Sequence, residues 1–139
     1  MSIRPADRRS KIVMAVDDQA ETLLLIQGFV EAAGFSFVGA LRGREAVSLT
    51  DRIAPRLILL DIQMPNIDGF ETCRMLRMNP SLRTVPIAFL TARKTAEDVT
   101  TGLGVGGNDF IVKPFDPDKL IERIEYWVGR RVSAGPGVG

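Results

Sequence analysis

Short apolar segments alternate along this chain with longer segments in which apolar residues recur at helical spacing. The apolar runs are bounded by turn or breaker residues, which is typical of strands buried on both faces; clear examples are residues 12–16, 57–60, 87–90 and 110–112. The alternation repeats five times and predicts right-handed crossovers. We therefore expect a parallel sheet with helices on both faces, an α/β fold with (βα)5 organisation.

The pattern also predicts the bounds of these elements. The expected strands cover residues 11–16, 35–40, 56–61, 86–91 and 109–113. The expected helices cover residues 19–33, 44–53, 68–79, 95–103 and 117–130. Thr95 with Asp98 three residues on, and Asp116 before Pro117, are typical helix starts. Trp127 continues the apolar period of the last helix, which favours a packing role for its ring.

Composition indicates an ordinary globular domain. The chain has 139 residues, of which 45% are hydrophobic and 25% charged, so one core accommodates it and collagen-like or disordered classes are excluded. We expect a folded domain at residues 11–130 between a flexible arm, residues 1–10, and a flexible tail, residues 131–139. The net charge of +1 gives no global field that would favour nucleic acid or an anionic membrane as a partner.

Cysteine and histidine usage narrows the chemistry further. Cys73 is the single cysteine and cannot form an internal disulfide, and its place in an apolar stripe indicates a core thiol. No segment resembles a signal peptide or a membrane span, so we expect a cytoplasmic protein. Histidine is absent, which leaves carboxylates, hydroxyls and amines to carry any reaction.

Five polar residues stand where the apolar segments stop. They are Asp17, Asp18, Asp61, Thr91 and Lys113. The carboxyl ends of parallel strands share one edge of the sheet, where open α/β sheets bind ligands, so these side chains should converge on one crevice. Crowded carboxylates require a cation, and Mg²⁺ prefers such hard oxygen ligands.

This set suits phosphoryl transfer to a carboxylate. With a divalent cation and Lys113 balancing three carboxylates, Asp61 can attack phosphorus and become an aspartyl phosphate. Lys113 would then place its charge on the phosphoryl oxygens, and Thr91 would donate a hydroxyl hydrogen bond. Each of these residues alone is commonly a cap or a solvated charge, but coincidence at four strand ends is improbable.

At these residues the chain resembles the receiver domain of two-component response regulators. The resemblance covers about residues 11–129. The matching segments are residues 16–18, 59–69, 90–92 and 109–115, with the sequences VDD, LLDIQMPNIDG, LTA and DFIVKPF.

The resemblance implies a flavodoxin-like sheet in strand order 2-1-3-4-5, with Asp61 accepting phosphate from a histidine kinase or a phosphotransfer protein. It implies Mg²⁺ bound by carboxylates and one carbonyl: Asp17, Asp18, Asp61 and the backbone carbonyl of Gln63. The backbone N–H of Ala92 would join Thr91 and Lys113 around the phosphoryl group. The Lys113–Pro114 bond is expected to be cis.

The resemblance also implies a switch rather than an enzyme. Phosphorylation would draw Thr91 inward, and Phe110 would follow, although a plain core aromatic is an equal alternative for Phe110. Output would appear on the face formed by the helices at 95–103 and 117–130 and the strand between them. We expect a monomer or a weak phosphorylation-dependent dimer, acting on a downstream protein that the sequence does not identify. Gly107 stands where the family usually has alanine.

Three other functions fit less well. An aspartyl-phosphate phosphohydrolase would need a second acid two residues after Asp61, where Gln63 stands. A flavin-binding module would need a hydroxyl- and glycine-rich loop where Asp17 and Asp18 stand. A receiver-like module that binds partners without phosphorylation is the remaining alternative, and the intact acid set argues against it.

Overall fold

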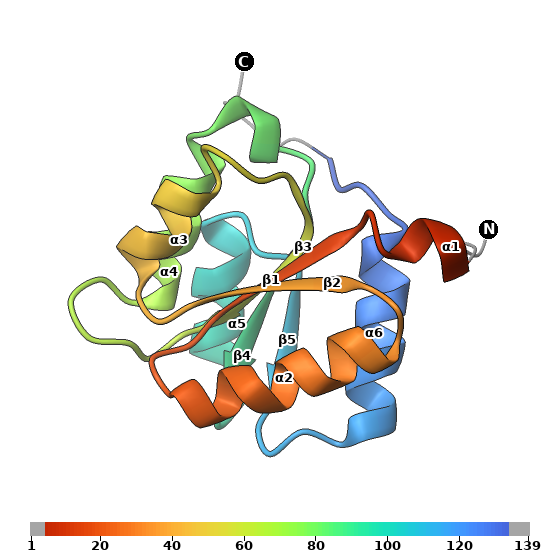
Figure 1. Cartoon of the computed structure of the whole chain (residues 1–139). Coiled ribbons are helices and arrows are strands. Elements are labelled where there is room, and N and C mark those ends of the chain that lie inside the picture. Colours follow the sequence, from red (N-terminus) through yellow and green to blue (C-terminus); the bar gives the residue numbers. More distant parts are fainter. Residues whose placement is uncertain (1–4, 134–139) are drawn as a thin grey trace.

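The structure is a computed structural model that describes residues 5–133. A parallel sheet with strand order β2-β1-β3-β4-β5 lies at its centre (Figure 1). The strands are β1 (Ile12–Val16), β2 (Ser36–Ala40), β3 (Pro55–Asp61), β4 (Ile87–Thr91) and β5 (Asp109–Val112). The flavodoxin-like order is confirmed, and every strand bound lies within one residue of its prediction.

A helix follows each strand as predicted, but the helix after β2 ends several residues before its predicted bound. The helices are α2 (Ala20–Ala32), α3 (Gly43–Leu49), α4 (Gly69–Arg77), α5 (Ala96–Gly104) and α6 (Pro117–Val128). The prediction that α3 reaches residue 53 is wrong, because the Thr50 hydroxyl donates to the Val47 carbonyl and a turn begins there. A 3-10 turn, η1 (Pro80–Leu82), was not predicted. No helix within residues 5–133 has both the length and the apolar content to cross a membrane.

The starts of two helices are confirmed as the sequence predicted them. The Thr95 side chain accepts from the backbone N–H of Asp98 at the start of α5. The Asp116 side chain accepts from the backbone N–H groups of Asp118 and Lys119 at the start of α6. These caps satisfy donors that a helix leaves unpaired at its first turn, so they fix where each helix begins after its strand.

The two faces of the sheet carry separate apolar cores. Helices α3, α4 and α5 cover one face, and α2 and α6 cover the other (Figure 1). Alternate residues of β1 divide between them: Met14 and Val16 pack on the first face, Val13 and Ala15 on the second. Because both faces are buried, the strands read as continuous apolar runs. Cys73 is fully buried in the first core, and its burial raises the pKa of the thiol to about 11, which confirms the core reading.

Two glycines let α5 and its following turn approach a pair of aromatic rings. A Cβ on Gly102 would lie 2.4 Å from Cζ of Phe110, and one on Gly107 would lie 2.1 Å from Cε2 of Phe89. The two rings are in contact, with centroids 5.3 Å apart. The large ring at position 89 therefore explains why glycine replaces the alanine expected at position 107.

Part of the segment predicted as a flexible arm, residues 5–8 of 1–10, is folded against the domain. Residues Pro5–Arg8 form the short helix α1. The Arg8 guanidinium donates to the Ala33 carbonyl at 2.9 Å, pairs with Glu125 at 2.8 Å and lies over the Phe35 ring. A planar cation that both stacks and donates can anchor a segment that has no apolar period of its own. The first four residues lie outside the described part of the chain.

The C-terminal segment is also anchored further than predicted. The backbone N–H of Val132 donates to the Thr84 carbonyl at 2.9 Å, and Arg131 donates to the Thr84 hydroxyl at 3.1 Å. The tail predicted at residues 131–139 is thus held at its first two residues by the loop before β4. Residues 134–139 lie outside the described part.

Candidate functional site

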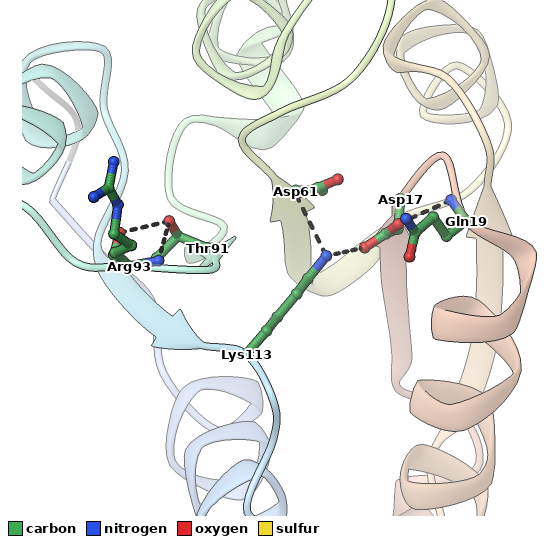
Figure 2. Close-up of polar contacts among 6 residues, drawn as sticks. All are labelled: Asp17, Gln19, Asp61, Thr91, Arg93 and Lys113. Atoms are coloured by element: carbon green, nitrogen blue, oxygen red, sulfur yellow. Dashed lines mark hydrogen bonds and ion pairs between the residues drawn. The ribbon is translucent and has the colours of Figure 1, made fainter.

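Strand register brings the predicted site residues to one edge of the sheet. Val16 pairs with Leu60, so Asp17 and Asp61 leave their strands side by side. Asp61 in turn pairs with Leu90, and Thr91 pairs with Val112. Strand β4 therefore ends one residue beyond β3, and β5 ends level with β4. Lys113 follows at the far end of this stagger, and its long side chain extends back along the edge towards the acids (Figure 2).

Three carboxylates meet at this edge. One carboxylate oxygen from each of Asp17, Asp18 and Asp61 lies within 4.8 Å of the other two. Asp17 is 0% exposed and Asp61 is 6% exposed. The Asp17 carboxylate accepts from the backbone N–H of Gln19 at 2.9 Å, which fixes the turn into α2. The predicted cluster is thus formed, with two of its three acids inside the protein.

Lys113 is the cation of the cluster. Its ammonium lies 2.7 Å from Oδ2 of Asp17 and 3.5 Å from Oδ1 of Asp61. Figure 2 shows the lysine reaching from the end of β5 to both acids. The Lys113–Pro114 peptide bond is cis, as the resemblance implied. One ammonium offsets part of the charge of three acids, so the cluster keeps an excess of negative charge.

Burial and this excess of negative charge together raise the pKa of Asp61. Burial, followed by the charge of Asp17, raises the pKa of Asp61 from 3.8 to about 6. Asp18 adds to this rise, while Lys113 and a hydrogen bond from the Gln63 backbone oppose it. An additional cation beside this carboxylate would favour its charged form and so oppose the rise in pKa caused by burial and by the neighbouring acids.

Thr91 does not join the cluster in this structure. Its hydroxyl donates to the Arg93 carbonyl at 2.7 Å and accepts from the Arg93 backbone N–H at 3.2 Å. Figure 2 shows this pair apart from the contacts of Lys113 with the two acids. The prediction that the hydroxyl points into the crevice is therefore wrong for this conformation, because the turn after β4 supplies two nearer backbone partners. Sequence reasoning did not identify Arg93 as the residue that holds this hydroxyl.

The remaining predicted site residues are Gln63, Ala92 and Phe110. Gln63 and Ala92 are exposed, each in the loop just beyond its strand. Phe110 is buried against Phe89 on β4, two residue pairs before Thr91 in the sheet. The Phe110 ring is thus a core aromatic close to Thr91, a position that fits both readings given to it by the sequence.

The donor set has a defined chemical capacity. Three carboxylate oxygens at this spacing are hard ligands suited to Mg²⁺ or a similar divalent cation. Lys113 supplies a positive charge that can also face an incoming anion. A buried carboxylate beside these cations can act as an oxygen nucleophile.

Comparison with known sequences gives a family. The family model described as the response regulator receiver domain matches residues 13–125. The phosphate regulon transcriptional regulatory protein PhoB of Rhizobium meliloti (strain 1021) is 38% identical over 121 residues, 86% of this chain and 52% of that protein. The alkaline phosphatase synthesis transcriptional regulatory protein PhoP of Bacillus subtilis (strain 168) is 33% identical over 127 residues, 91% and 52% respectively. This chain therefore spans about half the length of these relatives.

Solved structures agree with this comparison. The chemotaxis protein CheY4 of Vibrio cholerae superposes with a TM-score of 0.82 at 30% identity, covering 84% of this chain and 98% of that one. The receiver domain of a sensor histidine kinase from Pseudomonas aeruginosa PAO1, solved with a magnesium ion in its active site cleft, gives a TM-score of 0.78 at 28% identity, covering 86% and 98%. On its sequence, its strand order and its acidic edge, this chain belongs to the response regulator receiver domain family of two-component systems.

Proposed function

We propose that Asp61 accepts a phosphoryl group from a histidine kinase or a phosphotransfer protein. The observation that carries this proposal is the placement of Asp61 between an acid cluster and an ammonium. Its carboxylate shares the cluster with Asp17 and Asp18 and lies 3.5 Å from the Lys113 ammonium. Such a group can bring a cation and a phosphate to the same carboxylate.

The acid cluster fits Mg²⁺. Asp17, Asp18, Asp61 and the backbone carbonyl of Gln63 would hold the ion, all of them hard oxygen donors. When bound, Mg²⁺ neutralises charge on the carboxylates and on the phosphoryl oxygens. The raised pKa of Asp61 supports this assignment, since burial and the acids beside it leave Asp61 short of positive charge.

The transfer itself is a displacement at phosphorus. A carboxylate oxygen of Asp61 forms the new P–O bond as the P–N bond to the donor imidazole breaks. The electron pair of that bond returns to the imidazole nitrogen, and Asp61 becomes an acyl phosphate. Lys113 places its charge against the phosphoryl oxygens, and neither Lys113 nor Thr91 needs to move a proton.

Thr91 and Ala92 complete the phosphoryl site in this proposal. The Thr91 hydroxyl leaves the Arg93 carbonyl, to which it now donates at 2.7 Å, and donates to a phosphoryl oxygen instead. The backbone N–H of Ala92 joins it. Phosphorylation then favours an inward Thr91 because only that arrangement has the additional hydrogen bond, which makes the response a population shift.

The output of this shift is a surface for protein binding. Phe110 contacts the ring of Phe89 and faces Gly102 on α5, so a movement of Thr91 and Phe110 would reach the face formed by α5, β5 and α6. A downstream protein would read that face. We propose that the chain acts in the cytoplasm as a monomer or as a weak dimer that forms on phosphorylation.

Incubation with Mg²⁺ and acetyl phosphate, followed by intact mass measurement, tests the proposal. The wild-type protein should gain about 80 Da, the mass of one phosphoryl group. The Asp61→Asn variant should gain nothing, and omission of Mg²⁺ should suppress the gain in the wild type. Labelling of another residue, or none at all, would refute the mechanism. Sustained release of phosphate at many turnovers per minute would favour the phosphohydrolase alternative.

A further inference from the structure

A small pocket lies at the opposite edge of the sheet from Asp61. It has a volume of about 90 Å³ and is formed where β3 and β4 begin and where the chain leaves α6. Its polar lining residues are Arg56, Ser81, Thr84, Arg130 and Arg131. We call this the basic pocket. Figure 1 shows η1 and the segment after α6 together at that end of the molecule.

The basic pocket concentrates positive charge. Three of its lining residues are arginines and none is acidic. Within residues 5–133, none of the three forms an ion pair with a carboxylate. The whole chain carries a net charge of only +1, so this is a local excess that an anion would relieve.

Two of the guanidinium groups are already held in place. Arg130 donates to the Tyr126 carbonyl at 2.6 Å and stacks over the Tyr126 ring at 3.7 Å. Arg131 donates to the Thr84 hydroxyl at 3.1 Å, and the neighbouring Val132 N–H bonds the Thr84 carbonyl. Each fixed guanidinium still has further N–H donors. A ligand would therefore bind without the full entropy cost of ordering these side chains.

The size and the donors of the pocket indicate the class of ligand. Planar guanidinium forks and hydroxyl groups are the side chains that recognise tetrahedral oxyanions through paired, charge-assisted hydrogen bonds. The cavity is small, which favours a single phosphate-sized group over a ring or a peptide. We propose that the basic pocket binds a phosphate group, either as inorganic phosphate or as the terminal group of a small phosphate monoester.

The test is a titration followed by ¹⁵N–¹H correlation spectroscopy. It uses the Asp61→Asn variant without Mg²⁺, so that neither the acceptor carboxylate nor a divalent cation can draw phosphate to the acidic edge. Inorganic phosphate and glycerol phosphate are titrated separately at constant ionic strength. We expect saturable shifts of the backbone amides of Ser81, Thr84 and Arg131, and the tighter of the two ligands identifies the source of the phosphate group.

Matched variants make the test decisive. Arg56→Gln with Arg131→Gln should weaken binding by about tenfold or more, whereas Arg52→Gln, an exposed arginine outside the pocket lining, should leave it unchanged. Unchanged melting temperatures would show that the variants remain folded. Shifts that do not saturate, that centre on the acidic edge, or that persist in the double variant would overturn the proposal. Because this titration uses Asp61→Asn, its result is independent of whether Asp61 is phosphorylated.

Discussion

The ammonium of Lys113 is paired with Asp17, a carboxylate that is 0% exposed, at a distance of 2.7 Å. The two residues are 96 positions apart in sequence. Their strands, β5 and β1, are separated in the sheet by β3 and β4. A buried carboxylate with one cationic partner depends strongly on that partner, because its charge would otherwise stay unpaired away from water.

The first prediction concerns this pair. Lys113→Gln should lower the free energy of unfolding in the absence of Mg²⁺ by about 2–4 kcal/mol, because Asp17 loses its counter-ion. Urea denaturation measures the change. In an Asp17→Asn background the same lysine substitution should cost much less, and equal costs in both backgrounds would show that the pair does not stabilise the protein.

The second prediction concerns the pH dependence that Asp61 imposes. Its pKa in the folded protein is raised from 3.8 to about 6, so the folded state disfavours the charged form. Its contribution to stability is therefore greatest below pH 3.8 and is lost as the pH rises towards about 6. Without Mg²⁺, Asp61→Asn should be more stable than the wild type at neutral pH by about 1–3 kcal/mol.

Measurement of that difference across pH gives a clear outcome. Urea denaturation of both proteins at several pH values should show the advantage of Asp61→Asn shrinking as the pH falls from neutral to about 4. Addition of Mg²⁺ at neutral pH should stabilise the wild type more than the variant, since binding to the folded state shifts the equilibrium. A constant difference at every pH would contradict the assigned shift.

The third prediction concerns two glycines in α5. Gly102→Ala should destabilise the protein by about 1–3 kcal/mol, the range for overpacking a core, because its Cβ would lie 2.4 Å from the Phe110 ring. Gly104→Ala is the matched control, since no atom lies within 4 Å of the Cβ position there. The control should be neutral or stabilising by up to about 1 kcal/mol. Thermal unfolding compares them, and equal effects would contradict the packing argument.

The fourth prediction concerns the Thr91 hydroxyl. Thr91→Val removes the bond to the Arg93 carbonyl and should cost about 1 kcal/mol of stability. Acetyl phosphate should still phosphorylate Asp61, as measured by intact mass. The change that phosphorylation is expected to produce at Phe110 in the ¹⁵N–¹H correlation spectrum should however diminish, because the phosphoryl group has lost its hydroxyl donor. Thr100→Val, which alters an exposed threonine on α5, is the control and should leave that change intact.

The local pattern of the chain determined most of the fold. Continuous apolar runs predicted strands buried on both faces, and the capping residues Thr95 and Asp116 marked the starts of α5 and α6 correctly. These features depend on neighbours a few positions away, so they can be read without the tertiary structure. The acidic edge was also predictable, since parallel strands place their carboxyl ends together whatever their lengths.

Segments without a periodic pattern were predicted less well. Arg8 looked like part of a solvated arm, yet it is anchored by Ala33 and Glu125, and Glu125 lies 117 positions away. Such contacts depend on distant elements meeting. The residues near Arg8 in the sequence do not predict these contacts. The contact of Arg131 with Thr84 could not be predicted for the same reason.

The sequence by itself determined the sheet, its two cores and the identity of the residues at its acidic edge. Only the tertiary structure decided how those residues are paired: Lys113 with Asp17 more closely than with Asp61, and Thr91 with Arg93. The physical reason is that hydrophobic periodicity is a local property of the chain. Ion pairs and hydrogen bonds are decided by ångström-scale competition among groups that only folding brings together.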